Sequence, residues 1–112
     1  MLIVTDPRCL EHAVPRGHPE RPARLQAVLA HLEADGFLAR HTLRHPAAAD
    51  REALAAIHDP TYLDALERLS PADGLVPLDP DTMLGPMSLT AASLAAGAVA
   101  DSVRAVLRGE AE

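Results

Sequence analysis

The densest cluster of reactive side chains lies between His12 and Arg24, in the sequence HAVPRGHPERPAR. Two histidines, three arginines and one glutamate stand there among three prolines. Because proline fixes φ and reduces the freedom of the unfolded chain, such a loop can hold polar groups in place, as the rim of a substrate site requires. The alternative is a solvated loop whose Glu20 merely favours the following helix N-terminus through the dipole. Loops are generally enriched in such residues, so composition alone leaves both interpretations open.

Metal and nucleophile patterns are matched only in part. His18-Pro19-Glu20 has the H-x-E form of zinc deaminases, but those proteins need P-C-x-x-C downstream, and Cys9 lies upstream and alone. The histidines of HTLRH, residues 41–45, share a face in a helix or a strand, yet no third ligand is near, which favours surface or helix-cap histidines. Cys9 is more typical of a buried, inert thiol than of a nucleophile.

Asp79 and Asp81 form a second polar pair in the sequence LDPDT. Two neighbouring carboxylates suit acid–base chemistry or hydrogen bonding to a substrate amide. They suit a turn equally well, because aspartate and proline favour turns for steric reasons. The spacing does not decide between these two interpretations.

Short strands and helices are predicted around these residues. Apolar residues 1–5 predict a buried strand, and residues 38–44 predict a weaker one. Helices are predicted from Pro22 to Gly36, over 51–58 and 60–69 after two aspartate caps, and from a Ser88 cap to Gly109. Residues 70–86 predict a long loop. Two strands make no complete sheet, so residues 1–112 are expected to form a single incomplete α/β domain, mostly helical with one or two parallel strands.

Composition limits the class of protein. A net charge of −6 without a basic cluster argues against a nucleic-acid surface. The longest weakly polar run, residues 89–100, is about twelve residues long, whereas a membrane span needs about twenty. Residues 1–5 are too short for a signal-peptide core. We therefore expect a cytoplasmic protein without nucleic-acid or membrane contacts. Its core of small side chains would be thin if it stood alone.

Three segments together resemble the histone deacetylase superfamily, in particular its bacterial class II-like and acetylpolyamine amidohydrolase branches. The segments are GHPERPARL, HDPTYLDAL, and LDPDT followed by SLTAASLAAGAV, and their order and rough spacing match. The resemblance implies an arginase/deacetylase-like α/β/α sandwich around a parallel sheet. It also implies an amide hydrolase for acetyl-lysine or acetylpolyamine, in which a zinc-bound water attacks the acetyl-amide carbonyl.

The same resemblance assigns roles to individual residues. Arg24, which closes HPERPAR, matches the family's internal-cavity arginine near the acetate exit path. Asp79 and Asp81 are alternatives for one rim aspartate that hydrogen-bonds the substrate backbone or amide. The candidates for the substrate-channel rim are therefore His18, Pro19, Glu20, Asp79 and Asp81.

The family's zinc ligands and transition-state tyrosine lie later in its domain than this sequence extends. The sequence has neither paired histidines nor Asp-x-His, and Tyr62 falls in a predicted helix. We therefore expect an N-terminal segment that is inactive alone, with no catalytic residue, metal ligand or cofactor of its own, although zinc serves the complete domain. Its apolar faces predict a partner, either the missing C-terminal part or further copies of itself. The alternative function is a self-associating helical scaffold without catalysis.

Overall fold

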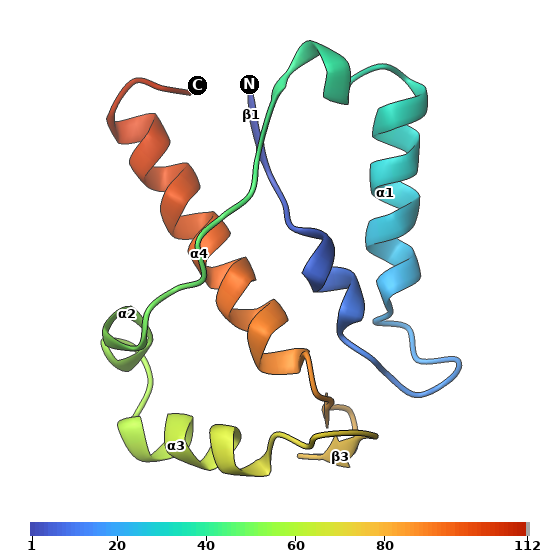
Figure 1. Ribbon diagram of the computed structural model, residues 1–112, viewed down its shortest axis with the longest axis vertical. Helices are drawn as coiled ribbons and strands as arrows, with labels where there is room; N and C mark the ends of the chain where they lie inside the picture. The colour runs from blue at the N-terminus through green and yellow to red at the C-terminus, as the bar shows by residue number, and fades with distance from the viewer. Residues whose placement is uncertain (112) are drawn as a thin grey trace.

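A long C-terminal helix and a pair of short parallel strands organise the chain (Figure 1). This computed structural model describes residues 1–111. The elements in chain order are β1 (Leu2–Val4), the 3-10 helix η1 (Pro7–Glu11), α1 (Pro22–Ala34), the 3-10 helix η2 (Leu38–Arg40), β2 (Thr42–Arg44), α2 (Arg51–Ala55), α3 (Pro60–Leu69), β3 (Val76–Pro77), β4 (Met83–Leu84) and α4 (Ser88–Leu107).

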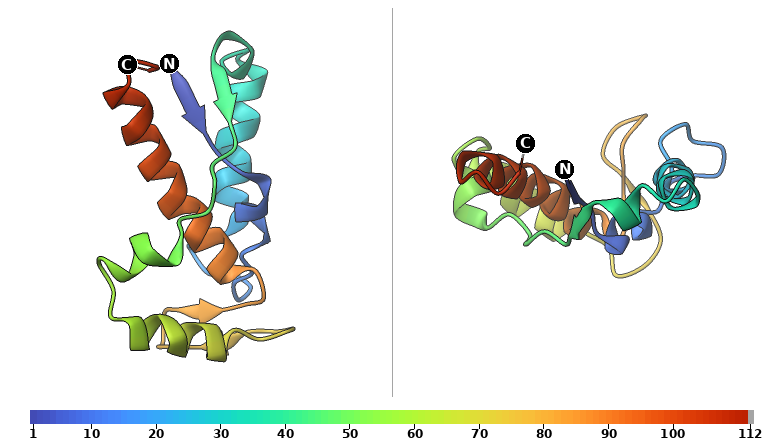
Figure 2. Two further views of the ribbon diagram at one scale, coloured as in Figure 1. Left: turned by 60° about the vertical axis from the view of Figure 1, so that its left-hand side comes forward. Right: turned by 90° about the horizontal axis from the view of Figure 1, so that it is seen from above.

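Strands β1 and β2 run parallel, with Ile3 opposite Leu43 in the register. Parallel strands need a crossover connection of a dozen or more residues, and α1 provides it beside the pair (Figure 2). The backbone N–H of Thr5 adds a hydrogen bond of 3.1 Å to the carbonyl of Arg44. The prediction of parallel strands in a mostly helical chain is confirmed.

Local sequence signals set most of the helix starts. Pro22 opens α1, where its missing N–H costs nothing, and Gly36 follows the helix with a φ of 65°. Asp50 accepts a hydrogen bond of 2.7 Å from the backbone N–H of Ala53 at the start of α2. Asp59 caps α3 in the same way. These predicted starts are confirmed.

Three helix and strand boundaries differ from the prediction. Helix α2 ends at Ala55 rather than at residue 58, because Pro60 keeps Asp59 out of the helical conformation and the chain must turn before α3. The strand predicted over residues 38–44 begins only at residue 42, because residues 38–40 form the 3-10 helix η2 with local hydrogen bonds. The segment between β1 and His12 contains the 3-10 helix η1, which was not predicted from the sequence.

The predicted loop at 70–86 and the predicted cap of the last helix also differ. Strands β3 and β4 form a small antiparallel pair within that loop, because a turn at residues 78–82 reverses the chain, with the N–H of Leu78 2.9 Å from the carbonyl of Thr82. Ser88 is the first residue of α4 and Met87 is its N-cap. The Ser88 hydroxyl bonds to groups outside the helix instead, as described below.

Residues 46–50 pass across the middle of α4 at Gly97. The backbone N–H of Ala49 donates to the carbonyl of Ser93 at 2.9 Å, and the N–H of Ala47 donates to the Asp101 carboxylate at 3.3 Å. A Cβ at position 97 would lie 1.9 Å from the carbonyl oxygen of Ala47. Only glycine permits this approach, which joins the segment after β2 to α4.

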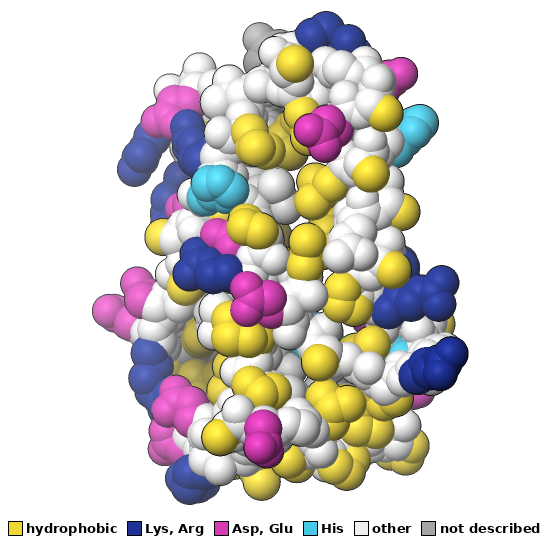
Figure 3. Space-filling model, turned by 45° about the vertical axis from the view of Figure 1, so that its right-hand side comes forward, with side chains coloured by type: hydrophobic (Ala, Val, Ile, Leu, Met, Phe, Trp, Pro, Cys, Tyr) yellow, Lys and Arg dark blue, Asp and Glu magenta, His cyan; other side chains and the backbone are white. Residues whose placement is uncertain are grey.

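The buried core is small and the molecule is a thin layer. The radius of gyration is 15.7 Å, whereas a compact domain of this length has about 13 Å. The shortest dimension is 20 Å. On the face drawn in Figure 3 exposed apolar side chains lie among charged ones, and they gather at the end of the molecule where α3 and the β3–β4 pair lie. The core of buried hydrophobic residues consists of Leu63, Leu84, Leu94 and Ala105.

Helix α4 is apolar on two opposite sides. One side, with Leu94 and Ala105, packs on the chain, mainly on η1 and β1. On the other side Val99, Val103 and Val106 recur at spacings of four and three residues and are 67%, 53% and 55% exposed. We call these three valines the outer face of α4. Within residues 1–111, α4 is the one helix long and apolar enough to cross a membrane, by length and composition only. Core helices of soluble proteins share that composition.

The close approach of residues 46–50 to Gly97 leads to a prediction about stability. Gly97→Ala should lower the free energy of unfolding by about 2 kcal/mol or more, because the added methyl group overlaps the Ala47 carbonyl. Urea unfolding followed by far-ultraviolet circular dichroism measures this in a chain without tryptophan. Ala95→Val, which adds bulk at an exposed position of α4, is the control and should cost less than about 0.7 kcal/mol. A Gly97→Ala variant that is more stable than the unaltered chain would contradict the close approach of the Ala47 carbonyl to α4.

Candidate functional site

A cavity of about 220 Å³ lies between the loop after η1 and the hairpin before α4. Two chain segments that are far apart in the sequence form its two walls. Three of the predicted rim residues, His18, Glu20 and Asp81, therefore come together in the fold. The lining residues are His12, Val14, Pro15, His18 and Glu20 on the first wall and Asp81, Thr82 and Met83 on the second.

The first wall is held by hydrogen bonds within the loop. The backbone N–H of His18 donates to the carbonyl of Pro15 at 3.1 Å. The Nδ1 atom of His18 lies 3.1 Å from the backbone N–H of Glu20 and 3.0 Å from its carbonyl. The Nε2 atom of the same ring is buried, and no hydrogen-bond partner for it lies within the part of the chain that the structure describes. His18 is thus fixed by one ring nitrogen while the other stays available.

The second wall separates the two aspartates. The Asp79 carboxylate accepts a hydrogen bond of 2.8 Å from the backbone N–H of Asp81. That bond and the Thr82 hydroxyl lower the pKa of Asp79 from its ordinary value. Asp79 therefore serves the turn, and Asp81 lines the cavity. Of the two aspartates only Asp81 is among the residues that line the cavity, and the assignment of either one to the rim stays a prediction.

Pro19 and Arg24 lie beside the cavity but are not among its lining residues. Pro19 is exposed. The guanidinium of Arg24, on the first turn of α1, forms an exposed ion pair with the Glu20 carboxylate one helical turn before it. Their assignments, to the rim and to an internal cavity respectively, stay predictions.

One side-chain contact joins the two walls. The Nδ1 atom of His12 lies 2.8 Å from the Ser88 hydroxyl oxygen, which also accepts a hydrogen bond of 2.7 Å from the backbone N–H of Gly85. Ser88 is only 8% exposed. Sequence reasoning missed this contact, because it treated Ser88 as a helix cap and because nothing local relates two residues 76 positions apart.

A buried carboxylate directs the chain from β1 into the first wall. Asp6 is 4% exposed, and its carboxylate accepts hydrogen bonds from the Arg8 backbone N–H at 2.9 Å and from the Arg8 guanidinium at 2.8 Å. These hydrogen bonds lower the pKa of Asp6 to about 2. The imidazole Nδ1 of His45 is 4.0 Å from the same carboxylate. Asp6 thereby caps η1, the helix that leads to His12.

His41, His45 and Cys9 each lie in local surroundings that give them no part in the cavity. The His41 ring packs against Phe37, with the ring centroids 4.2 Å apart, and the His45 Nδ1 atom is 2.9 Å from the carbonyl of Thr5. Burial raises the pKa of the Cys9 thiol, which reduces its reactive thiolate form. In residues 1–111, no three His, Cys, Asp or Glu side chains gather as a metal site would require.

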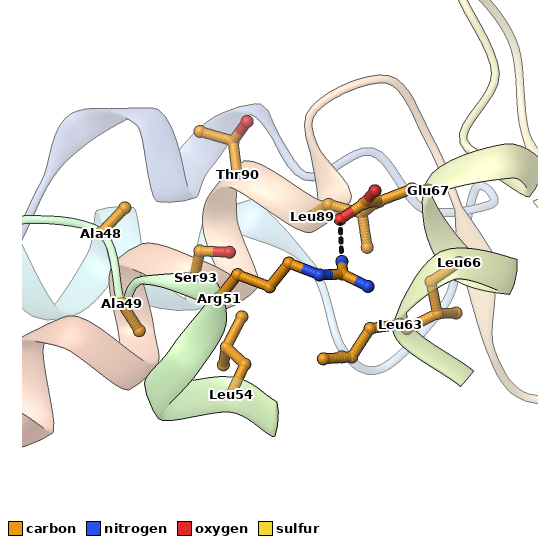
Figure 4. A pocket seen from close by; sticks show the side chains of 10 residues that line it. All are labelled: Ala48, Ala49, Arg51, Leu54, Leu63, Leu66, Glu67, Leu89, Thr90 and Ser93. Carbon is orange, nitrogen blue, oxygen red and sulfur yellow. Dashed lines mark hydrogen bonds and ion pairs between the residues drawn. The ribbon is translucent and has the colours of Figure 1, made fainter. Parts of the chain in front are cut away.

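A second cavity of about 340 Å³ lies between α2, α3 and α4 (Figure 4). Its walls are mainly leucine and alanine. The guanidinium of Arg51 reaches across it from α2 and bonds to the carboxylate of Glu67 at 2.6 Å and to that of Asp64 on α3. None of the predicted site residues lines this cavity.

Comparison with known proteins connects this fold to a family. The histone deacetylase domain matches residues 18–112. This stretch includes the second cavity wall and, from the first wall, His18 and Glu20. The chain belongs to the histone deacetylase family. The resemblance predicted from the three sequence segments is confirmed.

Two relatives show how much of the family domain is represented. The histone deacetylase-like amidohydrolase of Pseudomonas aeruginosa is 36% identical over 96 residues, which is 86% of this chain and 25% of that protein. The crystal structure of the HDA15 HD domain superposes with a TM-score of 0.87 and 30% identity, covering 97% of this chain and 32% of that one. The chain thus spans a quarter to a third of the length of these relatives. The predicted arginase/deacetylase-like α/β fold is confirmed.

The lowered pKa of Asp6 leads to a prediction about how the stability of the chain depends on pH in acid. Its pKa in the folded chain, about 2, lies below the ordinary value of 3.8. Its stabilising effect is therefore complete above pH 4 and is lost as the pH falls through 4 toward 2. Asp6→Asn should lower stability at pH 7 and flatten the loss of stability between pH 4 and pH 2, measured by urea unfolding at each pH. Asp73→Asn, at an exposed aspartate, should leave that slope unchanged; equal slopes in all three proteins would refute the role of Asp6.

Proposed function

We propose that residues 1–112 form the first part of a zinc-dependent deacetylase domain and supply one side of the channel that admits an acetylated amine. Acetyl-lysine and acetylpolyamine are the substrate class. The observation that carries the proposal is the cavity that brings His18 and Glu20 together with Asp81 in a chain of the histone deacetylase family.

The chemistry of the cavity suits a secondary amide on an alkyl chain. The Asp81 carboxylate can accept a hydrogen bond from an amide N–H. Val14, Pro15 and Met83 supply apolar surface for methylene groups. A pocket with apolar walls and a few polar groups fixes the orientation of such a ligand, which is the part that these residues would perform.

The residues present do not fit the zinc centre itself. A catalytic zinc needs three protein ligands around an open position, and residues 1–111 bring no such group together. We therefore assign the metal ligands to the part of the family domain that this sequence does not match, and we give the chain a role in binding and orienting the substrate.

The choice of Asp81 over Asp79 can be tested on the full chain. Titration with N-acetyl-lysine methylamide, followed by ¹H–¹⁵N nuclear magnetic resonance, should shift the amide signals of both cavity walls. Asp81→Asn should weaken binding about tenfold, because a hydrogen bond to a charged group is worth about 1.5–3 kcal/mol.

Asp79→Asn is the matched control, since it removes the same charge while an asparagine oxygen can still accept the turn hydrogen bond. It should bind the probe as the unaltered chain does. Binding that is unaffected by Asp81→Asn, or lost equally in both variants, would defeat the proposal.

The outer face of α4 favours a second candidate function, self-association of the chain. Three valines lie more than half exposed on a helix whose other side is already packed. Between Ser88 and Leu107 the only charged residues are Asp101 and Arg104. A second copy that packs its own α4 against this face would bury apolar surface that a chain only 20 Å thick leaves open.

We expect the isolated chain to sediment as a dimer or larger species at micromolar concentration. Exchange of Val99 and Val103 for aspartate should produce a monomer, because charges at the contact must be desolvated. The control is Ile57→Asp, at a residue that is 83% exposed and is not part of α4. This variant should leave the assembly intact. A folded monomer in the unaltered chain would exclude self-association through this face.

A further inference from the structure

We propose that His12 is a positioning residue that fixes the separation of the two cavity walls through Ser88. The inference rests on the proposed function, because it assigns His12 to the same substrate cavity. His12 lies on the first wall, and Ser88 stands at the start of α4, directly after the second wall.

The contact is a chain of three groups. The backbone N–H of Gly85 donates to the Ser88 hydroxyl oxygen at 2.7 Å, and the backbone N–H of Ser88 donates to the carbonyl of Gly85 at 3.1 Å. The hydroxyl then meets the Nδ1 atom of His12 at 2.8 Å. The turn that carries Asp81 and Met83 is thereby joined to the loop that carries His18.

No other hydrogen bond within residues 1–111 joins segment 12–20 to segment 79–88. The atoms involved are well shielded from water, since Ser88 is 8% exposed and Gly85 is buried. A hydrogen bond in such surroundings is costly to leave unmade. The separation of the two walls, and with it the distance from His18 to Asp81, therefore depends on this contact.

Asparagine can replace His12 in this role. Its side-chain amide offers either a donor or an acceptor at a position close to the imidazole Nδ1, so it can bond to Ser88 whichever group donates. Alanine offers neither. Ser88 does not line the cavity, so Ser88→Ala removes the link without removing a contact to the ligand.

The experiment measures binding of N-acetyl-lysine methylamide to the full chain by nuclear magnetic resonance, together with the thermal unfolding midpoint of each variant. Ser88→Ala and His12→Ala should each weaken binding by about threefold to tenfold, the effect of losing one hydrogen bond. His12→Asn should restore the affinity to within about twofold of the unaltered chain.

Matched controls separate positioning from general stability. Ser102→Ala removes another α4 hydroxyl, which bonds to the Ala98 carbonyl at 2.7 Å, away from the cavity. His45→Ala removes another histidine, bonded to the Thr5 carbonyl. Both should bind the probe normally even where they lower the unfolding midpoint.

Three outcomes overturn the proposal: unchanged binding in Ser88→Ala and His12→Ala, no recovery in His12→Asn, or a loss of binding in the controls that matches their loss of stability. The Asp81→Asn variant keeps the two proposals apart. If it weakens binding while the Ser88 and His12 variants do not, only the positioning role fails. If Asp81→Asn has no effect, the proposed function itself fails.

Discussion

The packing of one side of α4 against the N-terminal half of the chain is the contact on which the rest of the structure depends. Helix η1 and strand β1 lie on that side, and residues 46–50 cross it at Gly97. Since η1 leads directly to His12 and α4 begins at Ser88, the same contact brings the two cavity walls together. The candidate site is therefore a consequence of how the two ends of the chain meet.

The incompleteness of the layer has a physical basis in its elements. Strands of three residues bury too little to stabilise a sheet, and two of them leave both edges open. A helix that is apolar on two sides calls for a second packing partner. In the HDA15 HD domain the matched part is about a third of the structure, and the open outer face of α4 agrees with a chain that represents only part of such a layer.

Local signals predicted much of the fold, and tertiary contacts account for the rest. Pro22, Asp50 and Asp59 mark helix starts through interactions within a few residues, so the sequence suffices for them. The small β3–β4 pair was missed because strands of two residues have no periodicity, and their pairing depends on the turn that Asp79 stabilises. A motif led to the predicted rim residues, but the meeting of His18, Glu20 and Asp81 in one cavity follows from the packing on α4, which no local pattern records.

The two aspartates of LDPDT show how backbone conformation assigns different roles to identical groups. Asp79 sits where its carboxylate reaches the N–H two residues ahead, and that bond lowers its pKa and makes it a structural anion. The same bond orients Asp81 as part of the wall next to His12 and His18. A carboxylate already held by the backbone has less capacity to bond a ligand, whereas one that lines a cavity keeps its acceptors free. The turn therefore separates a residue that shapes the wall from the residue that we propose to bind substrate, and the His12–Ser88 contact joins the opposite wall to the helix that follows this turn.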